Sequence, residues 1–287
     1  MVRPFCTIGL IADTHYQDRL FSLPPGLEKW WEDADLILHA GDVGDLSVLD
    51  ELGKIVPTVA VHGNDEPEGT KHDLPEQQLV TLSRSRILVW HSHYPDPLEE
   101  KRNRPGPWRP KLARIARRAQ DVNAQVVVYG HTHVPIVHHQ QGVVIVNPGA
   151  LAAGSYFTRQ VIRTVAKLQV HADGNFSISH YNVDAGQEVT LAEVNQDEEF
   201  DRLGGQYQDW IVEPGMIDAI SLLRKMAYED VRAVVEAIVP LYKQSLPDGP
   251  MRRDDFIRAI EASQQITPND KENVLRAMSK MSYPGAA

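Results

Sequence analysis

Six short runs of apolar, β-favouring residues recur in the first half of the chain, and this recurrence constrains the fold more than any other feature. The runs cover residues 5–12, 36–39, 58–62, 87–91, 126–129 and 143–146, and polar residues follow each of them. Helical patterns at residues 46–55 and 111–119 lie between some of the runs. Because strands alternate with helices, the sequence predicts an α/β fold.

The segments that follow alternate apolar and polar residues. Residues 159–170 and 175–183 flank the dipeptide Asp173-Gly174. An Asp-Gly pair between two alternating segments is typical of a tight β-hairpin turn. The sequence therefore predicts an antiparallel pair of strands at an edge of the sheet.

From about residue 185 onward the apolar residues fall at helical spacing, and no further strand pattern is evident. The stretch 231–241 places its valines, isoleucine and leucine on one helix face, and Thr267-Pro268 followed by Asp270 is typical of a helix start. We expect a first domain at residues 1–185 and a small helical domain or cap at 190–287, of unknown role.

Composition and charge exclude several classes of protein. The apolar opening is only about eight residues long before polar residues begin, which predicts neither a signal peptide nor a membrane span. Cys6 is the only cysteine, so a disulfide framework is excluded and a cytoplasmic location is expected. The net charge is −10, and residues 185–287 carry 18 acidic against 11 basic side chains. Such a field repels phosphates, which argues against nucleic-acid binding by the tail.

A polar residue able to bind a metal ion follows each of five successive strand predictions. Loops at the carboxyl ends of strands converge on one edge of an α/β sheet, so these side chains are expected to meet. Carboxylate, amide and imidazole groups suit two divalent ions, and a pair of metals is the usual apparatus for hydrolysing phosphate esters. The residues are Asp13 and His15, Asp42, Asn64, His91, and His131 and His133.

Each of these signals has an ordinary structural explanation when taken alone. Gly41-Asp42 and Gly63-Asn64 are typical turn pairs, and a single histidine such as His91 is more often a buried residue bonded to a backbone group. The pair His131 and His133 is a stronger signal, because it can bring two imidazoles to one site. The combination is much more specific than its parts.

In this order the motifs resemble those of the calcineurin-like metallophosphoesterase superfamily. Residues 46–63 and 127–151 resemble its small prokaryotic phosphodiesterase branch, which is related to the retromer scaffold subunit. The resemblance covers roughly residues 5–180. The mixed oxygen and imidazole ligand set favours manganese, and iron, zinc or nickel would also fit. The resemblance implies a four-layer α/β/β/α sandwich of two mixed sheets and a pair of divalent ions. It implies one ion held by Asp13, His15, Asp42 and His133, and a second held by Asp42, Asn64, His91 and His131.

The resemblance implies hydrolysis of a phosphodiester by a hydroxide that bridges the two ions and attacks phosphorus in line. In many relatives a histidine follows the Gly-Asn pair and is proposed to protonate the leaving group. This chain has Asp65 at that position, and we predict Asp65 and His93 as the catalytic residues outside the ligand set. His93 is a candidate for that role, and a hydrogen-bond donor to the ligand shell is an equally good interpretation. Phosphomonoester or dinucleotide hydrolysis at the same site stays open.

The segment 101–118 contains eight basic residues and no acidic ones. A solvated helix face with a proline-rich loop is the favoured interpretation. The alternative is that Arg102, Arg104 or Arg109 attracts a phosphorylated or nucleotide substrate, with Trp108 offering a surface to a base.

A second class of function is a non-catalytic scaffold whose helical tail binds a protein partner or a second copy. The scaffold branch has lost some metal ligands, but this chain lacks none of them. The complete ligand set favours an enzyme.

Overall fold

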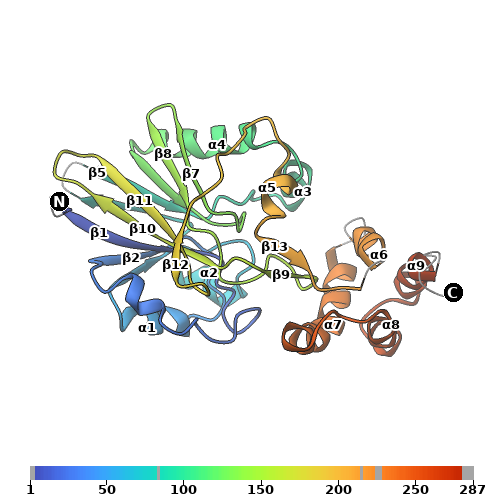
Figure 1. Ribbon diagram of the computed structural model, residues 1–287. Helices are drawn as coiled ribbons and strands as arrows, with labels where there is room; N and C mark the ends of the chain where they lie inside the picture. Colours follow the sequence, from blue (N-terminus) through green and yellow to red (C-terminus); the bar gives the residue numbers. More distant parts are fainter. Residues whose placement is uncertain (1–3, 83–84, 214–215, 224–227, 280–287) are drawn as a thin grey trace. The chain divides into compact units, whose positions relative to one another are not determined.

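The computed structural model describes residues 4–82, 85–213, 216–223 and 228–279. The chain forms two compact units (Figure 1). The first contains Met1–Gly154 and Gln160–Gln208, and the second contains Ser155–Arg159 and Asp209–Ala287. Compared with the expected ranges 1–185 and 190–287, the first unit therefore extends further along the chain, and a short earlier segment belongs to the second.

The first sheet of the larger unit is mixed. Its order is β12-β11-β10-β1-β2-β3, with β1, β2 and β3 parallel and the others antiparallel. The hairpin around Asp173-Gly174 is confirmed, since β10 pairs with β11. The strands are β1 (Cys6–Ile11), β2 (Leu36–His39), β3 (Thr58–Ala60), β10 (Thr164–Val170), β11 (Phe176–Asn182) and β12 (Gln187–Val189).

The second sheet is also mixed, with order β4-β5-β6-β8-β7. Its three central strands are parallel, and the two edge strands run antiparallel to them. The edge strands β4 and β7 escaped the sequence prediction because both carry many polar residues. The strands are β4 (Gln77–Leu82), β5 (Ser85–Trp90), β6 (Val126–Tyr129), β7 (Ile136–Gln140) and β8 (Val143–Asn147).

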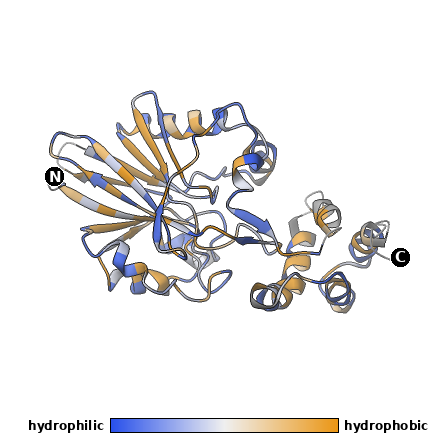
Figure 2. Ribbon diagram, in the orientation of Figure 1, coloured by the Kyte–Doolittle hydropathy of each residue, from blue (hydrophilic) through white to orange (hydrophobic). Residues whose placement is uncertain are grey.

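Burial on both faces of the strands explains their continuous apolar runs. In β6, Val126 and Val128 pack in the core shared by the two sheets, whereas Val127 and Tyr129 pack against the helix α4 (Trp108–Asp121). On the other side, Ile11 and Ile37 face a cluster that includes Val48 and Leu52 of α1 (Ser47–Gly53). Figure 2 shows the strands of both sheets largely in the hydrophobic colour.

The larger unit is therefore a helix, sheet, sheet, helix sandwich, and the predicted α/β fold with two mixed sheets is confirmed. Its remaining helices are short. They are the 3-10 helix Leu27–Trp30, α2 (Glu68–Asp73), α3 (Pro97–Asn103) and α5 (Phe200–Gly204).

The second unit is mainly helical, as the periodicity predicts. Phe256, Ile238 and Val274, from three different helices, are buried in one shared core. The Thr267 hydroxyl accepts from the Asp270 N–H at 3.2 Å, which confirms the predicted helix start. The helices are α6 (Met216–Leu223), α7 (Tyr228–Asp248), α8 (Arg253–Ala262) and α9 (Pro268–Ser279).

The expectation that strands cease near residue 185 is wrong. Strand β12 begins at Gln187, and β13 (Gln208–Trp210) pairs with β9 (Thr158–Gln160) in a separate two-stranded sheet. Three-residue strands are too short to show a period-two pattern. No helix in the described ranges is both long enough and apolar enough to cross a membrane.

Candidate metal centre

The polar residues predicted to meet at the strand ends do come together in the first unit. Asp13, His15, Asp42 and His133 form one group, and Asp42, His91 and His131 form a second. Within each group, the candidate ligand atoms all lie within 4.8 Å of one another. Asp42 belongs to both groups, so its carboxylate is placed where it can face two ions.

Asn64 lies on the loop after β3, and this loop contacts Asp42. The backbone N–H of Asp65 donates to Oδ1 of Asp42 at 2.9 Å. Asn64 itself is exposed. Its neighbour is therefore bonded to the shared carboxylate, and its own role as a ligand stays a prediction.

Burial gives this cluster its electrostatic character. Asp13 and His91 are fully buried, and Asp42 is 3% exposed. Burial raises the pKa of the Asp42 carboxyl, but His91 and His15 outweigh it and hold that pKa well below its usual value. Burial, reinforced by the Arg19 guanidinium, lowers the pKa of His15. Two buried carboxylates thus face imidazoles, an arrangement that requires positive charge.

The orientation of the imidazoles fits divalent ions. His91 donates from Nδ1 to the Ala40 carbonyl at 2.8 Å, and His133 donates from Nδ1 to the Ala152 carbonyl at 2.9 Å. These bonds point Nε2 of His91 toward Asp42 at 3.2 Å and Nε2 of His133 toward Asp13 at 3.3 Å. Nε2 of His91 and Nδ1 of His15 are buried and have no hydrogen-bond partner among the described residues. Carbonyl bonds that fix the tautomer are a common feature of histidine ligands.

Strained backbone delivers these side chains. Asp13, Asp42 and His131 have φ angles of 53°, 50° and 71°, in the left-handed region that non-glycine residues rarely adopt. His15 and His133 share this feature. Such strain costs of order 1–3 kcal/mol per residue and is concentrated at functional sites.

The glycines that precede the polar residues are required by close contacts. A Cβ atom at Gly63 would overlap Oδ1 of Asp42, and one at Gly130 would lie 2.6 Å from the Ala40 carbonyl oxygen. At Gly41 it would lie 2.6 Å from Nδ1 of His91. The Gly-Asp, Gly-Asn and Gly-His pairs therefore leave room for the ligand cluster.

Two residues that support the site were not predicted from the sequence. Glu66 is buried and accepts the backbone N–H groups of Val43 at 2.6 Å and Gly44 at 2.9 Å, and also that of Gly63, which joins the loops after β2 and β3. Arg19 is also buried, and its guanidinium contacts the Asp65 carboxylate and the Ala153 carbonyl. No local pattern distinguishes either residue from other charged residues of the chain.

Asp65 and His93, the two predicted catalytic residues, lie beside the cluster. Asp65 pairs with Arg19 and lies 3.8 Å from Nδ1 of His15. The His93 ring centroid is 5.6 Å from that of His91 and 6.4 Å from that of His131. Burial, followed by the neighbouring histidines, lowers the pKa of His93 to about 3. Their catalytic roles stay predictions.

A third unpredicted residue is Glu100 in α3. Its carboxylate lies 2.8 Å from Nε2 of His131 and also accepts the Tyr94 N–H at 3.0 Å. With Nε2 occupied, Nδ1 is the nitrogen of His131 that can serve as a ligand. A carboxylate bonded to the far side of a ligand histidine fixes its tautomer and raises its basicity.

The structure corrects one hypothesis about the basic segment. Trp108 is 1% exposed and packs on Phe200 with ring centroids 5.2 Å apart, so it does not offer an open surface to a base. Arg109 forms a bidentate pair with Asp197 at 2.9 Å. Arg102 and Arg104 are exposed.

Two facing mixed sheets, with a buried cluster of potential metal ligands at their strand ends, define this protein as an α/β sandwich of the metallophosphoesterase class. The model of the calcineurin-like phosphoesterase superfamily domain matches residues 7–173, and the chain belongs to this family.

Two sequence relatives from Methanocaldococcus jannaschii agree with this assignment. A probable metallophosphoesterase of Methanocaldococcus jannaschii is 30% identical over 163 residues, which cover 57% of this chain and 75% of that protein. A phosphodiesterase of the same organism is 26% identical, over 50% of this chain and 82% of its own length. Among solved structures, vacuolar protein sorting 29 of Cryptosporidium parvum gives a TM-score of 0.49 at 17% identity, covering 64% of this chain and 94% of that one.

The contact between Gly63 and Asp42 predicts the effect of one methyl group. Gly63→Ala should weaken manganese binding about 100-fold, because the new Cβ displaces the shared carboxylate. Equilibrium dialysis measures this. Gly69→Ala is the matched control, since a Cβ there meets nothing within 4 Å, and it should bind manganese like the wild type. Unchanged manganese affinity in Gly63→Ala would contradict the assignment of Asp42.

Glu100 provides a test that separates the two ion sites. If His131 binds the second of two predicted ions, Glu100→Gln should weaken the binding of that ion by about 10- to 100-fold and leave the other predicted ion bound. Calorimetric titration at limiting manganese should then give one ion per chain instead of two. The exposed neighbour Glu99 supplies the control variant Glu99→Gln, which should still bind two. Loss of both ions, or of neither, would show that Glu100 does not act through His131.

Proposed function

We propose that this protein is a phosphodiesterase that works with two divalent metal ions, manganese being the preferred pair. The observation that carries the proposal is the shared position of Asp42, which belongs to both groups of candidate ligands. Family membership supports a metal-dependent hydrolase, and the name of one relative, the phosphodiesterase of Methanocaldococcus jannaschii, supports the choice of diesters.

Each side chain has a distinct part in holding the ions. When bound, two divalent ions supply Lewis-acid chemistry, polarising phosphate oxygens and lowering the pKa of water. Asp42 would serve both positions. Asp13, His15 and His133 would complete one position, and His91 and His131 would complete the other together with Asn64, the ligand predicted from the sequence. The carbonyl bonds at Ala40 and Ala152 keep two of the imidazoles aimed at the carboxylates before substrate arrives.

Asp65 stands where many relatives carry a histidine after the Gly-Asn pair, and this replacement supports the choice of diesters. The Asp65 side chain is 50% exposed and forms an ion pair with Arg19. We assign His93 the role of a neutral hydrogen-bond donor to the ligand shell, because its ring lies next to those of His91 and His131 and its lowered pKa leaves it without a proton to give at neutral pH. Phosphomonoester and dinucleotide hydrolysis are the competing activities.

The proposal predicts a metal-dependent diesterase. Metal-stripped protein resupplied with manganese should hydrolyse bis(p-nitrophenyl) phosphate faster than p-nitrophenyl phosphate. Asp42→Asn should lower kcat/KM for the diester by at least about 1,000-fold, because both ions lose a ligand. Release of nitrophenolate is the readout.

Faster turnover of the monoester would contradict the proposed phosphodiesterase activity and indicate a phosphomonoesterase. Absence of turnover with manganese, iron, zinc and nickel, together with partner binding that needs no metal, would instead establish a scaffold.

A further inference from the structure

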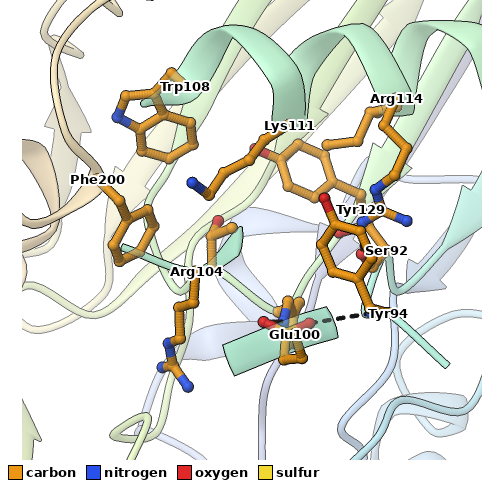
Figure 3. A pocket seen from close by; sticks show the side chains of 12 residues that line it. Ser92, Tyr94, Glu100, Arg104, Trp108, Lys111, Arg114, Tyr129 and Phe200 are labelled. Carbon is orange, nitrogen blue, oxygen red and sulfur yellow. Dashed lines mark hydrogen bonds and ion pairs between the residues drawn. The ribbon is translucent and has the colours of Figure 1, made fainter. Parts of the chain in front are cut away.

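A pocket opens beside the metal cluster, on the side of His131 (Figure 3). His131 both lines this pocket and belongs to the second ligand group. The pocket is built by the loop after β5, by α3 and α4, and by Phe200 of α5. It lies entirely within the first unit, and a ligand in it would contact the same histidine that faces the ion.

Lys111 is the first of two cations of α4 that line this pocket, and it is the buried one. The residue is 8% exposed, and its ammonium group donates to the carbonyls of Gly106 at 2.6 Å and Pro107 at 3.3 Å. It also lies 5.8 Å from the centroid of the Phe200 ring. An ammonium group has three donors, so one remains beyond these two carbonyls.

Arg114 is the second cation, one helical turn further along α4. Its guanidinium donates to the Ser92 carbonyl and lies 4.0 Å from the centroid of the Tyr94 ring. Its Nε atom is buried and has no hydrogen-bond partner among the described residues. In Figure 3 the side chains of Lys111 and Arg114 extend from the same helix toward opposite sides of the pocket.

The charge of the pocket is not balanced by its own carboxylates. Among the twelve lining residues, all of them described, Glu100 is the one acidic side chain. That carboxylate is already engaged by His131 and by the Tyr94 N–H. Arg104, also in the lining and exposed, interacts electrostatically with this carboxylate. The other acidic neighbours of Lys111 and Arg114, Asp201 and Glu99, lie outside the lining, so an anionic ligand would add a counter-charge inside the pocket.

The segment that carries Phe200 is bonded to the start of α4. The Arg109 N–H donates to the Gln196 carbonyl at 2.8 Å, and the Trp108 N–H donates to the Glu198 carbonyl at 3.3 Å. The bidentate pair of Arg109 with Asp197 adds a third attachment. This wall of the pocket lies beyond residues 7–173, so it is a feature of this chain outside the matched family domain.

We propose that this pocket binds a second anionic group, a phosphate or a carboxylate, carried by the leaving group of the substrate. The proposal rests on the proposed function, which places the reacting phosphate at the ion pair. Lys111 and Arg114 would then determine specificity by binding the charge at the far end of the ester. The substrate class is a phosphodiester whose leaving group is itself negatively charged.

The test compares two phosphonates that cannot be hydrolysed. The first is 4-carboxyphenylphosphonate, and the second is 4-carbamoylphenylphosphonate, in which an uncharged amide replaces the carboxylate. Calorimetric titration of the manganese-loaded full-length protein should show the carboxylate binding about 10-fold more tightly, since it gains a charge-assisted hydrogen bond. Lys111→Met should abolish this preference, and Lys111→Arg should keep it. Arg117→Met, an exposed change on the same helix, should leave it unchanged.

Equal affinity for the two phosphonates, in a protein that hydrolyses diesters, would contradict anion binding by the pocket and leave the proposed function intact. A preference that survives in Lys111→Met, with circular dichroism of the variant unchanged, would also overturn it. If neither phosphonate binds and no diester is hydrolysed, both proposals fail together.

Discussion

The burial of two carboxylates against four imidazoles is the constraint on which the site depends. Asp13 and Asp42 lie beneath the surface and face His15, His91, His131 and His133, and each group of them can surround one ion. Such a cluster is unstable unless cations or imidazolium charge compensate it. Several of its residues also adopt left-handed backbone angles. The fold therefore pays a local cost that metal binding can offset, because an ion binds the folded chain far better than the unfolded one.

The rest of the first unit explains how that cost is tolerated. The strands that deliver the ligands are buried on both faces, and the parallel centres of both sheets place their carboxyl ends together. Glu66 bonds the loops after β2 and β3 to each other, and the Ala40 and Ala152 carbonyls hold two imidazoles. The buried strands and the hydrogen-bonded loop amides together hold the ligand loops in backbone conformations that each loop alone would not adopt.

The sequence predicted the features that depend on local patterns. The central strands were evident because burial on both faces leaves continuous apolar runs, and the glycine pairs marked the loops where a Cβ atom has no room. Edge strands such as β4, with the sequence QQLVTL, are specified by pairing with a neighbour and not by their own composition. Glu100 and Glu99 are indistinguishable in sequence, and only the packing of α3 brings one of them to His131. Long-range contacts of this kind produce no periodic pattern in the sequence.

The residues proposed to carry out the reaction and those proposed to determine its specificity also belong to different parts of the first unit. The candidate ligands lie at strand ends that the core requires, so the fold determines their positions. The pocket beside His131 is walled partly by Phe200, which lies outside the matched domain and is attached to α4 by two backbone bonds and one ion pair. A change in this segment alters the shape and charge of the pocket and leaves the strand ends in place. In the proposed pocket, the charge on Lys111 and Arg114 is the physical variable that determines which leaving group the protein accepts, and it can vary while the strand ends keep their positions.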